Sequence, residues 1–156
     1  MLKSLSRLTL TADGRYATSA ELAFLHQYLD SVKSRISAYE KIRNNEADII
    51  AEIEARKEKA GPNLFQMGNH DVREICRRDM TDIIRCTVAA MLFDELEQLQ
   101  NRVLLWYRTI VKAFNYERNA DITYDIIQSV INSHLAEAEV AAVKPFFELD
   151  HLVLSS

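Results

Sequence analysis

The residues best suited to chemistry are a thiol, a guanidinium and a carboxylate within one helical turn. They form the stretch Cys76-Arg77-Arg78-Asp79, inside a helical pattern, and Arg85 follows nine positions after the cysteine. A thiol can bond covalently to a ligand, an arginine fork can pair with carboxylates, and an aspartate can accept hydrogen bonds from N–H groups. The stretch therefore predicts a site for a large acidic ligand that contains nitrogen.

Each of these residues also has an ordinary interpretation. A lone cysteine is more often buried and inert. Asp79 could instead form an ion pair within the helix, and Arg78 could be a solvated charge on the helix surface. For Arg77 the solvated charge is the preferred interpretation. The positive charges of Arg73, Arg77 and Arg78 near Cys76 favour its thiolate form.

Composition excludes several classes of protein. The chain has 156 residues, 48% of them hydrophobic and 27% charged, as is typical of a globular domain. A net charge of -4 gives no basic footprint for nucleic acid, and no apolar run is long enough to span a membrane. The histidines are scattered without metal-ligand spacing, so we expect no metal site. On one helix Cys76 and Cys86 would be about 15 Å apart, too far for a disulfide, so both are expected to be free.

Apolar periodicity predicts a single all-α domain over residues 1–156. Only 3 glycines and 2 prolines interrupt the chain, which favours long helices. We expect about seven helices, with a long one beginning at a Thr18–Glu21 capping box and a last one running from about Thr123 to Ala142, where Pro145 ends the pattern. Trp106 and Cys86 are interpreted as core residues. Six of these helices are expected to cover about 2–10, 18–44, 47–60, 71–92, 96–115 and 123–142.

The central segment resembles a known family, the phycobiliproteins, which are the bilin-carrying subunits of phycobilisomes. The match runs without a gap from Cys76 to Arg108. The resemblance as a whole covers about residues 10–115, includes Ala12-Asp13-Gly14-Arg15-Tyr16, and is weaker at the C-terminus. The residues that carry the central match are Cys76, Arg78, Asp79, Arg85, Ala90-Met91-Leu92, Arg102, Leu104 and Arg108.

The resemblance implies a globin-like bundle with two extra N-terminal helices that pack against a partner subunit. It implies that Cys76 carries phycocyanobilin or a related linear tetrapyrrole as a thioether, and that Asp79 accepts hydrogen bonds from the two central pyrrole N–H groups. Arg78 would pair with one propionate and Arg73 with a second. Such a protein would harvest light and transfer excitation, and would not be an enzyme.

The resemblance also implies partners and a location. The residue matching Asp13 on one subunit reaches the residue matching Arg85 on the other. This chain has both, so it could form a homodimer or meet an α/β-type partner, with linker proteins or photosystem subunits as further partners. Two unrelated surface charges are the alternative. The expected location is the cytoplasmic side of a thylakoid membrane or a plastid stroma.

Some positions depart from the family pattern near the expected pocket. The family usually has two aromatic residues six and seven positions after the cysteine, where this chain has Asp82 and Ile83. The family's Thr-Tyr pair is replaced by Val88-Ala89, and its turn of a small residue, Gly and Asp is replaced by Phe93-Asp94-Glu95. These differences indicate a divergent paralogue. Two other functions stay open: a pigment-free protein that assists assembly of a photosystem or antenna, and an enzyme or carrier that handles bilins transiently.

Overall fold

The structure is a computed structural model that describes residues 1–156, except for the side chain of Pro62. Most of the chain is helical, which confirms the all-α prediction. Because the π-helical turn η2 joins α5 to α6 without a break, these three count as one helix, and the described residues then form seven helices. The helices are α1 (Leu2–Thr11), α2 (Ser19–Asn44), α3 (Glu46–Ala60), α4 (Arg73–Phe93), α5 (Leu96–Leu99), η2 (Gln100–Leu104), α6 (Leu105–Ala113), α7 (Glu117–Ser133) and α8 (Glu137–Leu154).

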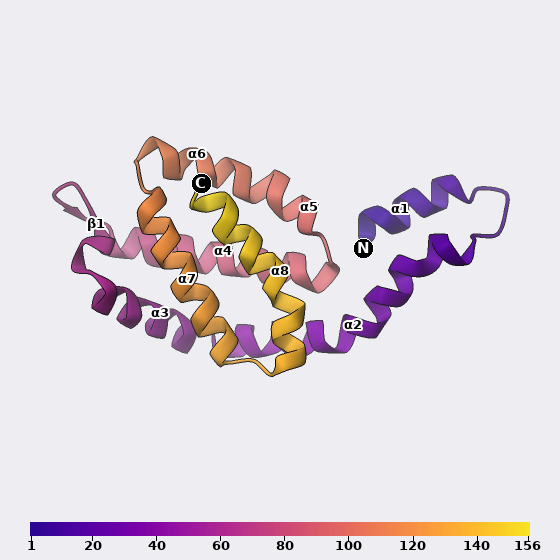
Figure 1. Ribbon diagram of the computed structural model, residues 1–156, viewed down its shortest axis with the longest axis horizontal. Coiled ribbons are helices and arrows are strands. Elements are labelled where there is room, and N and C mark those ends of the chain that lie inside the picture. The colour runs from indigo at the N-terminus through magenta and orange to yellow at the C-terminus, as the bar shows by residue number, and fades with distance from the viewer.

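The N-terminal segment forms an arm that loops out from the rest of the molecule and returns to it at Met1, whose amino group donates to the Asp94 carbonyl oxygen at 2.7 Å. In Figure 1, α1 and the first half of α2 make a hairpin that projects to one side, whereas the second half of α2 runs along the body. The capping box predicted at the start of α2 is present: the Thr18 side chain accepts from the Glu21 N–H, and the Thr18 N–H donates to the Glu21 carboxylate at 2.8 Å. The second of the two extra N-terminal helices is not a separate helix: it is the first half of α2, which continues without a break to Asn44.

The body is held together by an apolar core between the later helices. Helix α8 packs against α2, α4 and α7, and α3 packs against α7. Figure 1 shows α8 lying across α4, with α7 beside it. The core contains fully buried side chains from nearly every helix, among them Ile53, Met91, Leu104, Ile127 and Leu154.

A short connection between α3 and α4 closes one end of the body. It holds the 3-10 turn η1 (Pro62–Phe65) and a two-stranded antiparallel hairpin, β1 (Gln66–Met67) and β2 (His70–Asp71). Gln66 pairs with Asp71, and Met67 with His70. Gly68 lies in the tight turn with φ of 60°, where a side chain would be strained.

The prediction for the C-terminal third was wrong in its boundaries. The segment contains two helices rather than one, and the break falls between Ser133 and Glu137 rather than at Pro145. Pro145 lies inside α8, where it lacks the N–H that would bond to the carbonyl four residues earlier. The helix continues because Val143, Phe146 and Phe147 on both sides of the proline are buried in the core, and this packing outweighs the local preference.

Candidate functional site

A groove between α4 and α6 hollows the body, with a volume of about 600 Å³. Volumes of this order are typical of small-molecule sites. One wall is α4, which presents Ile75, Cys76, Asp79, Ile83 and Cys86. The other wall is α6, which presents Trp106, Tyr107, Ile110 and Val111, together with Phe114 directly after the helix. The walls are mainly apolar, with a few polar groups that could orient a ligand.

The thiol of Cys76 lines this groove and is free and half-buried. Its Sγ lies 3.8 Å from the hydroxyl of Tyr116. Because that hydroxyl donates to the carbonyl oxygen of Leu64 at 3.0 Å, its oxygen is left to accept from the thiol. Cys76 is therefore positioned beside open space rather than sealed among core side chains.

The carboxylate of Asp79 lies one turn further along the same wall. Its Oδ1 accepts from Arg78, with Nε at 3.0 Å and Nη2 at 2.9 Å, and its Oδ2 accepts from the Tyr107 hydroxyl at 3.0 Å. Burial raises the pKa of Tyr107 far above its usual range, and the charge of Asp79 adds to this effect. Tyr107 therefore stays protonated and remains a donor to Asp79.

The structure brings together three of the four predicted pigment-binding residues. Cys76, Arg78 and Asp79 all line the groove. Arg73 does not line it; its guanidinium pairs with Glu58 at 2.6 Å and lies over the ring of Phe65. In the structure Arg73 is thus turned to other partners than a ligand in the groove.

The cations expected to favour the thiolate are each paired with a carboxylate. Arg73 pairs with Glu58, Arg78 with Asp79, and Arg77 with Glu54 at 2.8 Å. A different cation lies behind this end of the site: Lys57 is fully buried, with its Nζ 4.7 Å from the centre of the Phe65 ring. Burial lowers the pKa of Lys57, whereas the neighbouring Cys76 acts in the opposite direction. Sequence periodicity alone did not point to this lysine, because its neighbours in α3 are charged.

The aromatic wall of the groove was missed from the sequence. Trp106 was predicted to pack in the core, but 64% of it is exposed and it lies on the groove. Its ring centre lies 6.3 Å from that of Tyr107. Phe114 is exposed at the same wall. The prediction failed because a helix rich in leucine shows an apolar stripe, but its periodicity does not tell whether the stripe faces a core or a cleft.

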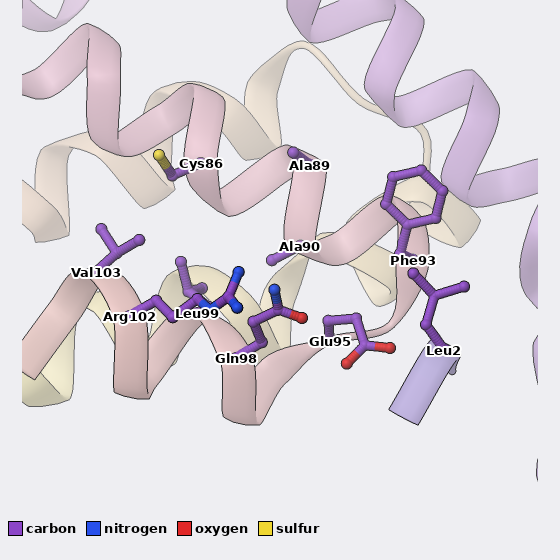
Figure 2. A pocket seen from close by; sticks show the side chains of 10 residues that line it. All are labelled: Leu2, Cys86, Ala89, Ala90, Phe93, Glu95, Gln98, Leu99, Arg102 and Val103. Atoms are coloured by element: carbon purple, nitrogen blue, oxygen red, sulfur yellow. The ribbon is translucent and has the colours of Figure 1, made fainter. Parts of the chain in front are cut away.

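Cys86 was also predicted to be a core residue, and the structure corrects this. Cys86 is exposed and lines both the groove and a second, smaller pocket of about 290 Å³. Figure 2 shows this pocket between α4 and the α5–η2 segment, with Leu2 of α1 beside Phe93 at one end. Partial burial raises the pKa of Cys86, and the carboxylate of Asp82 acts in the same direction. Its thiol is therefore mainly protonated near neutral pH.

The two residues predicted to meet across an interface lie far apart in the fold. Asp13 is exposed in the turn after α1, at the tip of the arm. Arg85 is exposed on α4 and pairs with Glu46 of α3 through two contacts of 2.6 and 2.7 Å. The pairing of Asp13 with Arg85 of another subunit stays a prediction.

Two further findings concern what the described part of the chain holds. None of its helices is both long and apolar enough to cross a membrane. Within the described residues, no three histidine, cysteine, aspartate or glutamate side chains gather as ligands for a metal ion.

Comparison with known proteins points to one family. The sequence model of the phycobilisome proteins matches residues 8–153. The chain is also similar to the allophycocyanin alpha-B chain of Cyanidium caldarium, with 25% identity over 86% of each chain. The all-α architecture agrees with the globin-like fold of that family, as the central motif implied. Phycobiliproteins are light-harvesting pigment carriers rather than enzymes, and they assemble with other phycobiliprotein subunits in antennae associated with thylakoids.

Proposed function

The chain belongs to the phycobilisome protein family, and we propose that it carries a linear tetrapyrrole, phycocyanobilin or a close relative, as a thioether on Cys76. One observation carries the proposal. The Cys76 thiol and the Asp79 carboxylate, one turn apart on α4, both line a groove large enough for such a ligand. The pigment, when bound, supplies visible absorption and an excited state that can be transferred to a neighbouring pigment.

Attachment needs only an addition reaction. The sulfur of Cys76 bonds to one carbon of a double bond on a terminal pyrrole ring. The S–H bond breaks, and the proton ends on the other carbon of that double bond. No oxidant or reductant is needed, so a lyase that delivers the pigment suffices as the helper.

The groove offers the two kinds of contact that the rest of such a pigment requires. The carboxylate of Asp79 suits the pyrrole N–H groups, because an ionised acceptor strengthens these hydrogen bonds. Arg78 has a side chain that is 68% exposed at the groove mouth, where it can reach a propionate. The aromatic wall of α6 offers flat apolar surface against which pyrrole rings can pack.

The direct test is production of the chain in cells that also make a bilin and a bilin lyase. We expect a coloured protein whose band fluoresces with zinc and survives denaturing electrophoresis, because a thioether withstands denaturation. A chain that stays colourless and unlabelled would contradict the proposal. It would favour the pigment-free protein that assists assembly of a photosystem or antenna.

We further propose that the arm is the surface for a second subunit, either a copy of this chain or an α/β-type phycobiliprotein. Large apolar side chains are exposed along it, including Leu10, Tyr16 and Leu29, and exposed apolar surface of this kind favours association. Linker proteins or photosystem subunits are further candidate partners. The location proposed for such an assembly is the cytoplasmic side of a thylakoid in a cyanobacterium, or the stroma of a plastid.

Charge reversal tests the proposed contact between Asp13 and Arg85. We expect Asp13→Arg to weaken self-association, or association with a co-expressed partner subunit, by about two- to fivefold, since an exposed ion pair contributes little. Adding Arg85→Asp should restore part of the affinity, as measured by sedimentation. Because Arg85 also pairs with Glu46 in the same chain, Glu46→Gln is the matched control and should not weaken association. If association is unchanged in Asp13→Arg alone and in Arg85→Asp alone, the two residues do not form this contact.

A further inference from the structure

The two partners of the Asp79 carboxylate differ in how firmly they are held. Arg78 is the neighbouring residue on the same helix, and adjacent side chains on a helix do not naturally face each other. Its side chain is largely exposed, so solvent competes for its guanidinium. Tyr107 comes from a different helix, α6, and its ring packs against the buried core. The contact from Tyr107 is therefore the durable one, and the contact from Arg78 is readily exchanged.

The position of Tyr107 in the fold reinforces this difference. It lies just after the π-helical turn η2. Such turns within α-helices are frequently found at functional sites. Its hydroxyl reaches Asp79 Oδ2 at 3.0 Å, whereas Arg78 covers only Oδ1. The two partners thus divide the carboxylate between them.

We propose that Tyr107 is a positioning residue that fixes the plane of the Asp79 carboxylate, and that Arg78 is an exchangeable partner that a linear tetrapyrrole displaces. This inference rests on the proposed function. When the pigment enters, Arg78 leaves Oδ1 and its guanidinium becomes available for a propionate. Oδ1 then accepts from a pyrrole N–H, while Tyr107 continues to hold Oδ2, which has a second lone pair for the other pyrrole N–H.

The test uses the pigment-loaded chain and the variant Tyr107→Phe. We expect covalent loading to persist, because Cys76 is untouched. The population of extended relative to folded pigment should fall by about two- to tenfold, as expected for loss of one buried hydrogen bond. The ratio of visible to near-ultraviolet absorbance, which reports an extended and rigid pigment, should fall with it. Tyr28→Phe is the matched control, since Tyr28 does not line the groove and its hydroxyl donates to the Leu92 carbonyl oxygen at 3.0 Å. Its absorbance ratio should stay near that of the unmodified chain.

Two further variants separate positioning from a general structural role. The double variant Tyr107→Phe with Asp79→Asn should be no worse than Asp79→Asn alone, because Tyr107 acts through Asp79. Arg78→Ala should lower the amount of loaded protein while leaving the absorbance ratio of the loaded fraction near normal. An unchanged ratio in Tyr107→Phe, or additive losses in the double variant, would overturn the proposal.

A pigment-free measurement distinguishes this inference from the proposed function. In protein labelled with ¹³C-tyrosine, the Tyr107 Cζ resonance is identified by its absence in Tyr107→Phe, and Asp79→Asn should shift it. A colourless wild-type chain would overturn the proposed function. The response of this resonance to Asp79→Asn would still show whether Tyr107 contacts Asp79. If Asp79→Asn leaves the resonance in place, Tyr107 does not position Asp79 and the inference fails on its own.

Discussion

Replacing Cys76 by alanine is expected to abolish covalent pigment attachment, with no zinc-fluorescent band left after denaturing electrophoresis. The reason is chemical: a thioether needs a sulfur, and the only other cysteine of the chain is Cys86. Cys76 is half-buried and lines the groove one turn from Asp79. The loss should be complete rather than partial, which makes this the largest effect that we predict.

Cys86→Ala provides the matched control on the same helix. Cys86 also lines the groove, but it lies about 15 Å further along α4. Its pKa is raised by partial burial, so its thiolate is scarce and it reacts slowly. We expect Cys86→Ala to retain the full pigment band. Circular dichroism of both variants should show the helical content of the unmodified chain.

The opposite pattern would be equally informative. A band that persists in Cys76→Ala and disappears in Cys86→Ala would place attachment at the far end of the groove and remove the role proposed for Asp79. A band lost in both variants would indicate that attachment depends on the shape of the whole α4 wall. A band retained in both would show that either cysteine can carry the pigment, so attachment would not be specific to Cys76.

The helices could be predicted from sequence where local signals and packing agree. The Thr18–Glu21 capping box is a contact between residues three apart, so the sequence predicts it directly. Pro145 shows the opposite case. A proline normally ends a helix, but Phe146 and Phe147 bury their side chains against other helices, and these distant contacts decide the outcome.

The candidate site was predictable on one wall only. Cys76, Arg78 and Asp79 are neighbours in sequence, so their proximity needs only a helix. Tyr107 meets Asp79 across 28 positions of chain, and this contact depends on how α6 packs on α4. Periodicity gives no such information, and the exposed Trp106 was misassigned to the core for the same reason.

A buried acid in the core gives the second large effect, on stability. Asp150 of α8 is 0% exposed, its Oδ1 has no partner among the described residues, and its Oδ2 accepts from the Thr87 hydroxyl at 2.7 Å. Burial raises the pKa of Asp150 well above its ordinary value, and the bond from Thr87 acts only partly against this. The carboxyl group is therefore neutral in the folded protein over a range of pH in which it ionises in the unfolded chain.

The sign of the resulting pH dependence follows from proton binding. Above the unfolded pKa of about 4, the folded state holds one more proton on Asp150 than the unfolded state does. The contribution of Asp150 to stability is fully present below that pKa and is lost as pH rises toward and through the folded pKa. We expect Asp150→Asn to remove this part of the pH dependence, measured as the free energy of unfolding in urea at about pH 4 and about pH 7. Glu148→Gln, which alters an exposed acid on the same helix, should leave the pH dependence unchanged.

Removing the hydrogen bond from Thr87 should lower the free energy of unfolding, because the Asp150 carboxyl group is then buried without a partner. We expect Thr87→Val to destabilise the fold by about 1–3 kcal/mol, since it leaves both carboxyl oxygens without a hydrogen bond. The same change made together with Asp150→Leu should recover most of that loss, because apolar groups can replace both partners of a buried bond at little cost. Urea unfolding of the two variants measures both effects. If Thr87→Val is as stable as the unmodified chain, or the double variant is less stable than Thr87→Val alone, then Asp150 does not depend on Thr87 and its burial is compensated by other contacts.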